Sequence, residues 1–189
     1  MSQQQGNGAS LNANSKASEP GNSSDHRGRF AATVAANIPL CKEHHRLILR
    51  LEQFPATYPG QFIQVACRNL ELDYSPDSEF AWEPGQLVSL GGRELMSRLA
   101  LLRRPFSLGG RRQVSDGVEL DLIYRTVGIG TQWLTRLLPG DSLQIIGPLG
   151  NRFELPGENG VAILVGGGVG IPPMLYLAQM LTGRRVVAF

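Results

Sequence analysis

The chain has 189 residues and a net charge of +2, which allows one full domain and part of a second. Its basic residues are scattered, which argues against a nucleic-acid-binding protein. The two cysteines, Cys41 and Cys67, are too few for a metal-ligand cluster or a disulfide framework, so we expect a cytoplasmic protein. His44 and His45 would point to opposite faces of a strand, so no metal site is expected from them either.

The first 28 residues are rich in Ser, Asn, Gln and Gly and contain almost no apolar side chains. Such a segment buries too little surface to offset the entropy lost on ordering, so residues 1–28 are predicted to be disordered. The segment lacks the apolar stretch of a secretory signal and the many arginines of a transit peptide.

From about residue 29, short β-type segments alternate with turn signals. The strand-like segments are FAATVAANIPL, HRLILRLEQF, QFIQVAC, LALLRRPFSL, GVELDLIYR and DSLQIIGPL. Their number and spacing predict an antiparallel β-barrel over residues 29–156. One helix is predicted within it, TQWLTRLL at 131–138, which Pro139-Gly140 ends. Trp133 and Leu134 on that helix are expected to pack against the barrel.

Residues 71–97 interrupt this pattern. They contain six of the chain's sixteen acidic residues and show no clear periodicity. A loop of this length is unusual in a compact barrel, so we interpret the segment as an acidic insertion.

A different pattern begins after Pro156. VAILV predicts a buried strand, GGGVG a turn, IPPMLYLAQML a helix and RRVVAF a second strand, which together form one βαβ unit of a parallel sheet. A lone βαβ unit has too few strands for a stable sheet, so we interpret residues 157–189 as the start of an incomplete second domain. No charged residue occurs from Val161 to Gly183, but the glycines and prolines there argue against a membrane-spanning helix.

Two stretches suit an anionic ligand. In RRPFS, Pro105 biases Arg104 toward an extended backbone, which holds the guanidinium in one place. In YRTVGIGT, a strand leads through a Gly-x-Gly turn to a helix whose predicted N-cap is Thr131, and free N–H groups at such a site favour phosphate. Phe106 shares a strand face with Arg104 and would pack against an aromatic ring or in the core. The alternatives are a solvated strand edge and an ordinary strand-to-helix turn.

A family resemblance follows from several motifs taken in chain order. PGQF (59–62), RPFS (104–107), YRTVGIGT (124–131), GPLGNRF (147–153) and VGGGVGIPP (165–173) resemble the ferredoxin–NADP reductase superfamily. Within it, residues 30–189 are similar to the electron-transfer subunits of two-component dihydroorotate dehydrogenases. The resemblance implies an antiparallel, Greek-key, FAD-binding β-barrel followed by the first βαβ unit of an α/β nicotinamide-binding domain. It also implies a [2Fe-2S] cluster in the full-length parent, held by four cysteines that this chain does not contain.

The resemblance assigns flavin contacts to both anion-binding motifs. Arg104 would pair with the FAD pyrophosphate, which Gly130 and Thr131 would cap, and Ser107 would lie near the reactive edge of the isoalloxazine. Ile123, Tyr124 and Arg125 would contact the ribityl and phosphate portion. The complete set of expected FAD contacts is Arg104, Pro105, Phe106, Ser107, Ile123, Tyr124, Arg125, Gly130 and Thr131. Arg103 has no matched role and is expected to be solvated.

The glycine-rich turn departs from the G-x-G-x-x-G dinucleotide fingerprint, because Pro173 stands where the third glycine would be. The pattern G-x-G-x-x-P is similar to that of the reductase superfamily, in which Gly168 and Gly170 would let NAD(H) approach the backbone. The choice between NAD and NADP stays open.

The function implied by the resemblance is electron transfer in pyrimidine biosynthesis. Electrons would pass from NADH through FAD and the cluster to a separate, FMN-containing catalytic subunit of dihydroorotate dehydrogenase. The present chain alone would at most bind FAD, and whether it acts as an enzyme is left open. One alternative is another reductase subunit of the same superfamily, serving a hydrogenase or a ferredoxin. The other is a barrel module without flavin that docks onto a partner. Neither nucleic acid nor a membrane is expected as a partner.

Overall fold

The computed structural model describes residues 26–68, 100, 102–155 and 160–189. The predicted acidic insertion at 71–97 lies outside these residues, as does nearly all of the predicted disordered tail. Within the described part of the chain, no helix is long and apolar enough to cross a membrane.

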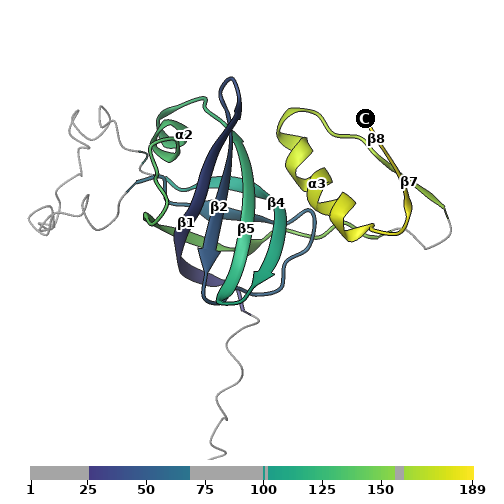
Figure 1. The fold of residues 1–189 in the computed structure, drawn as a ribbon, viewed down its shortest axis with the longest axis horizontal. Helices are drawn as coiled ribbons and strands as arrows, with labels where there is room; N and C mark the ends of the chain where they lie inside the picture. The colour runs from purple at the N-terminus through teal and green to yellow at the C-terminus, as the bar shows by residue number, and fades with distance from the viewer. Residues whose placement is uncertain (1–25, 69–99, 101, 156–159) are drawn as a thin grey trace, which may run out of the picture.

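Six antiparallel strands form a closed barrel in the order β1-β2-β5-β4-β3-β6 (Figure 1). The strands are β1 (Gly28–Cys41), β2 (His44–Leu51), β3 (Phe62–Val65), β4 (Arg104–Val114), β5 (Gly117–Arg125) and β6 (Ser142–Leu149). Strands β3, β4 and β5 are neighbours in sequence and in space, and β6 returns to lie beside β3, which is the Greek-key arrangement. The predicted fold class is confirmed.

The inward-facing side chains of the strands fill the interior of the barrel. In β2, Leu47, Leu49 and Leu51 are buried and alternate with more exposed residues, the period that a strand with one core face requires. Residues Leu120 and Leu122 of β5 join the same cluster. Burial of this apolar surface is the main stabilising contribution to the barrel.

Helix α2 (Ile129–Leu134) covers one end of the barrel. Leu134 is fully buried and Trp133 packs against the core, as predicted. The helix begins two residues earlier than expected and ends at Leu134, and the chain then continues as turns in which Arg136 and Leu137 donate to carbonyls three residues back. The predicted helix over 131–138 is therefore correct in kind and wrong at both ends.

The second unit is the predicted βαβ. Strands β7 (Val161–Leu164) and β8 (Arg185–Ala188) pair in parallel. The 3₁₀ helix η3 (Gly168–Gly170) and helix α3 (Ile171–Met180) connect them. Ala162 and Leu164 of β7 pack with Leu177 of α3 and with Leu181, and form a small core of their own. Figure 1 shows α3 between β4 of the barrel and the β7–β8 pair.

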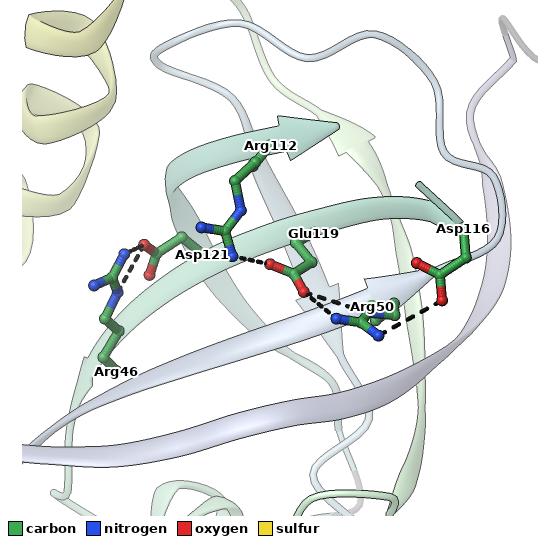
Figure 2. A network of polar contacts seen from close by, with 6 residues as sticks. All are labelled: Arg46, Arg50, Arg112, Asp116, Glu119 and Asp121. Carbon is green, nitrogen blue, oxygen red and sulfur yellow. Dashed lines mark hydrogen bonds and ion pairs between the residues drawn. The ribbon is translucent and has the colours of Figure 1, made fainter. Parts of the chain in front are cut away.

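A network of ion pairs covers the outer face of β2, β4 and β5 (Figure 2). Arg50 and Arg112 both donate to the carboxylate of Glu119, which is 5% exposed, and Arg46 donates through two nitrogens to Asp121. The hydrogen bonds from Arg50 and then Arg112 hold the pKa of Glu119 below its usual value. These pairs connect three neighbouring strands on the side opposite to the core.

Candidate functional site

The two predicted phosphate-binding motifs meet in the structure. Arg104 is the first residue of β4, and Gly130 lies in the first turn of α2. A Cβ added to Gly130 would lie 3.4 Å from Cγ of Arg104 and 3.3 Å from Cβ of Cys67. A side chain at this position would crowd the stem of the arginine, so glycine favours this close approach of the helix. The strand end and the glycine turn thus form one continuous site.

Arg104 is half-buried as a residue, and none of the hydrogen bonds or ion pairs among the described residues engages its guanidinium. Its charge acts on Cys67, although burial dominates there and raises the pKa of that thiol to about 11. Cys67 is therefore a neutral thiol near pH 7. Since a half-buried cation is normally paired, Arg104 is the residue in this site most suited to receive an anion.

Arg103, in contrast, was predicted to be solvated, and this is wrong. Its guanidinium donates to the backbone carbonyl of Gln144 at 3.0 Å and to the side-chain oxygen of the same residue at 3.4 Å. Burial, with the charges of Arg29 and Arg68, lowers its pKa. Arg103 therefore connects its segment to β6 and is not a second free cation.

The prediction that Thr131 is the N-cap of α2 is wrong. The N-cap is Gly128, and Thr131 is the third helical residue. The Thr131 hydroxyl accepts from the backbone N–H groups of Val127 and Gly128 at 2.9 and 3.1 Å, and donates to the Gly128 carbonyl at 3.0 Å. Thr131 therefore stabilises the turn from a position within the helix. The extended backbone at Gly128 places the N–H groups of this turn next to the Thr131 hydroxyl.

The predicted aromatic residues gather around Tyr124. This side chain is 4% exposed, and its hydroxyl donates to the side-chain oxygen of Asn37 at 3.3 Å. The ring of His45 stacks on it with centroids 5.3 Å apart, and Phe106 meets it edge-on at 6.2 Å. Burial raises the pKa of Tyr124 to about 12, so the phenol stays protonated.

The remaining predicted flavin contacts are exposed or half-buried. Arg125 is exposed and forms an ion pair with Glu43 at 2.9 Å, so an incoming phosphate would share its guanidinium with that carboxylate. Pro105 is exposed, whereas Ser107 and Ile123 are half-buried. Ser107 pairs across the strands with Phe62 of the PGQF motif, which brings these two motifs together.

Sequence reasoning missed three residues of this end of the barrel. Asn37 donates to the carbonyls of Leu134 and Leu137, and Glu43 accepts from the backbone N–H of Thr126 through its carbonyl. The side-chain oxygen of Thr126 is buried without a hydrogen-bond partner among the described residues. The first two depend on strand pairing, but Thr126 stands inside the YRTVGIGT motif and could have been singled out there as a polar side chain next to the glycine turn.

The glycine-rich turn before α3 presents bare backbone. Gly168 has φ +54°, a conformation that favours glycine, and a Cβ at Gly167, Gly168 or Gly170 would meet nothing within 4 Å. Val169 between them is 89% exposed. A flat ligand can therefore approach the main chain here without displacing a side chain.

A separate cavity of about 340 Å³ lies where α3 borders the charged face of the barrel. Its lining includes Arg46, Arg112, Glu119 and Asp121, and these four groups are already paired with each other or with Arg50. None of the predicted site residues lines it. The Arg104–Gly130 region, with its unpaired cation, is the stronger candidate.

Comparison with known proteins gives relatives for this arrangement. Over 106 residues the chain is 43% identical to the dihydroorotate dehydrogenase B (NAD(+)) electron transfer subunit of Geobacillus thermodenitrificans, covering 55% of this chain and 40% of the relative. The corresponding subunit of Lysinibacillus sphaericus is 35% identical over 125 residues, covering 65% and 47%. The chain is therefore similar in sequence to these electron-transfer subunits over somewhat more than half of its own length. It spans less than half of their length, and no family model matches it.

The fold of this chain is also similar to those of solved reductases. The ferredoxin reductase of carbazole 1,9a-dioxygenase superposes with a TM-score of 0.61 at 21% identity, covering 86% of this chain and 42% of the reductase. The flavohem-like FAD/NAD binding domain of nitric oxide dioxygenase from Vibrio cholerae gives a TM-score of 0.54 at 18% identity, covering 84% and 60%. These similarities confirm the fold, an antiparallel barrel followed by a βαβ unit.

Proposed function

We propose that this chain is the FAD-binding part of an electron-transfer subunit of dihydroorotate dehydrogenase. In the whole protein, electrons would pass from NAD(H) through FAD and a [2Fe-2S] cluster to an FMN-containing catalytic subunit, in pyrimidine biosynthesis. The observation that carries the proposal is Arg104, a half-buried residue whose stem packs against Gly130 and whose guanidinium has no partner among the described residues, in a chain similar in sequence to such subunits.

The residues fit the phosphate portion of FAD. Arg104 supplies an unpaired cation, and the Gly128 position is open, since a Cβ there would meet nothing within 4 Å. The hydroxyl of Thr126 is a buried polar group without a hydrogen-bond partner in the part of the chain that the structure describes. An arginine, a hydroxyl and an open glycine backbone are the groups that bind phosphate in proteins.

Bound FAD would supply the redox chemistry, accepting a hydride and releasing single electrons. The chain's own residues would bind and orient it. Arg104 would neutralise the pyrophosphate beside Gly130 and Thr131, and Arg125 would add charge near the ribityl and phosphate portion. The predicted flavin-lining side chains are Pro105, Phe106, Ser107, Ile123 and Tyr124. The stack of His45 on Tyr124 would limit the movement of that wall of the site.

NAD(H) is proposed to bind at the turn that contains Gly168 and Gly170, where the backbone is accessible. The [2Fe-2S] cluster belongs to the proposal for the whole protein and rests on the resemblance; Cys41 is exposed and Cys67 is buried, and neither is assigned to it.

The test compares two neighbouring arginines in the full-length protein. Arg104→Ala should weaken FAD binding by about 10- to 100-fold, because it removes a charge-assisted contact to phosphate. Arg103→Ala should leave FAD affinity within about twofold, since the Arg103 guanidinium is engaged by Gln144. Substitutions outside the groups that bind a ligand usually have small effects. Flavin absorbance and titration of the apoprotein with FAD measure both. Equal affinity in the two variants, or a folded wild-type protein that takes up no FAD, would contradict the proposal.

A further inference from the structure

Helix α3 is shared between the two structural units. Tyr176 in the middle of the helix is 4% exposed and belongs to the buried cluster of the barrel. Its neighbour Leu177, and Leu181 directly after the helix, belong to the other cluster, with Ala162 and Leu164 of β7. The helix therefore packs against the barrel on one side and against its own small sheet on the other.

The contact between Tyr176 and the barrel includes a pair of buried hydrogen bonds. The hydroxyl of Tyr176 donates to the backbone carbonyl of Thr57 at 2.7 Å and lies 2.9 Å from the Thr57 hydroxyl, from which it accepts. Thr57 is 6% exposed and lies between β2 and β3. Burial raises the pKa of Tyr176, so the hydroxyl keeps its proton and the donated bond persists at neutral pH.

A pair of glycines in β4 brings the helix close to the barrel. A Cβ on Gly109 would lie 3.7 Å from Cβ of Pro172, and a Cβ on Gly110 would lie 3.1 Å from the amide oxygen of Gln179. Both glycines are buried. Pro172 and Gln179 stand near the two ends of α3, so residues from both ends of the helix reach this one pair of glycines.

This packing connects the two predicted cofactor positions by a short path. Gly109 follows Ser107, the residue expected at the flavin edge, by two residues, or about 7 Å of strand. Pro172 follows Gly170, in the turn expected to bind NAD(H), by two residues. The Gly109–Pro172 contact therefore joins both positions through one strand and one helix. Hydride transfer needs its donor and acceptor held at a fixed separation.

We propose that Tyr176 is a positioning residue that, through its hydrogen bonds to Thr57, holds the nicotinamide-binding turn in place relative to the flavin-binding strand. This inference rests on the proposed function. It assigns the bonds a role in the geometry of electron transfer and not in FAD affinity, because Tyr176 belongs to α3 and contacts none of the predicted FAD residues through a hydrogen bond.

The first test is the Tyr176→Phe variant of the full-length protein, in which only the hydroxyl is lost. FAD affinity and the flavin absorbance spectrum should be unchanged. The rate of flavin reduction at saturating NADH, followed in a stopped-flow experiment, should fall by about tenfold, the order expected for a small misplacement of the reacting groups. Tyr58→Phe is the matched control; this adjacent, 39% exposed tyrosine should leave the reduction rate unchanged. Thr57→Val should slow reduction less than Tyr176→Phe and add nothing to it in the double variant.

The second readout does not depend on flavin. Amide hydrogen exchange across residues 171–181 should become faster in Tyr176→Phe, while exchange across β1 and β2 stays as in the wild type. Unchanged exchange, or an unchanged reduction rate in the flavin-loaded variant, would overturn the positioning role. A wild-type protein that binds no flavin would overturn the proposed function instead, and the exchange measurement would still decide whether Tyr176 anchors the helix.

Discussion

Asn37 connects three parts of the barrel that are far apart in sequence. Its amide nitrogen donates to the carbonyls of Leu134 and Leu137, at 2.8 and 3.1 Å, and its oxygen accepts from Tyr124. The carbonyls at the end of a helix have no partner within the helix, so a donor from β1 stabilises both the end of α2 and the following turn. The same side chain fixes the phenol at the centre of the aromatic group.

Replacing this residue should destabilise the barrel measurably. Asn37→Ala removes one donor from two carbonyls, of which that of Leu134 keeps the N–H of Leu137, and the acceptor of the Tyr124 hydroxyl. We expect a loss of roughly 1–3 kcal/mol in the free energy of unfolding. Urea denaturation followed by circular dichroism measures this loss. Asn151→Ala, at an exposed loop position, should change the same quantity by less than about 0.5 kcal/mol. Similar denaturation midpoints for the two variants would show that the Asn37 bonds contribute little.

The β4–β5 hairpin depends on a glycine for two separate reasons. Gly117 has φ +144°, and a Cβ there would lie 2.1 Å from the carbonyl oxygen of Leu51. Gly140 also has a positive φ, +97°, but a Cβ at that position would meet nothing within 4 Å. The two residues thus separate the effect of backbone strain from that of a steric clash.

Gly117→Ala should therefore be the more damaging of two formally similar substitutions. We expect Gly140→Ala to lower the free energy of unfolding by about 1 kcal/mol through backbone strain alone. Gly117→Ala should lower it by about 2–4 kcal/mol, because the end of β2 at Leu51 must also move. Thermal unfolding of both variants against the wild type measures the difference. Equal losses would mean that the turn relaxes around the new methyl group.

The strands could be predicted because their signals are local, and the errors lie where the deciding contact is distant. The alternation around Leu47 and Leu49 and the turn signals between segments identify each strand without knowledge of its partners. The predicted start of α2 at Thr131 is wrong, because serine and threonine are preferred N-cap residues. Here the Thr131 hydroxyl lies within the helix and accepts from the N–H groups of the preceding turn. The role of Asn37 depends on which strand ends lie beside α2, which is a property of barrel closure.

In the candidate site, too, local motifs could be predicted and contacts between distant residues could not. Motif order predicted that RPFS and GIGT cooperate, and the structure brings Arg104 against Gly130. The resemblance singled out Arg104 for the anion, but it could not predict that Arg103 is engaged by Gln144 of β6, because that contact joins residues 41 positions apart. Arg125 is similarly held by Glu43 at the tip of the β1–β2 hairpin, a contact between residues 82 positions apart.

At the scale of the whole molecule, the outer face of the barrel is stabilised by charge in a pH-dependent way. Glu119 receives hydrogen bonds from Arg50 and Arg112, which are on different strands (Figure 2). Its folded-state pKa lies below its usual value. A carboxylate with a lowered pKa stabilises the folded state above its unfolded pKa of about 4.3, and this contribution is lost as pH falls through the folded value.

Glu119→Gln should therefore make the stability of the barrel depend less on pH in the acid range. Near pH 7 the variant should unfold at a lower urea concentration than the wild type, because the buried amide replaces a carboxylate that two arginines need. As pH falls below about 4, the wild type should lose stability faster and the two midpoints should converge. Asp116→Asn removes only a 3.6 Å ion pair whose carboxylate is 63% exposed, and should leave the urea midpoint nearly unchanged at neutral pH. A difference between Glu119→Gln and the wild type that stays constant from pH 7 to about pH 3 would show that the charge of Glu119 is not what stabilises this face.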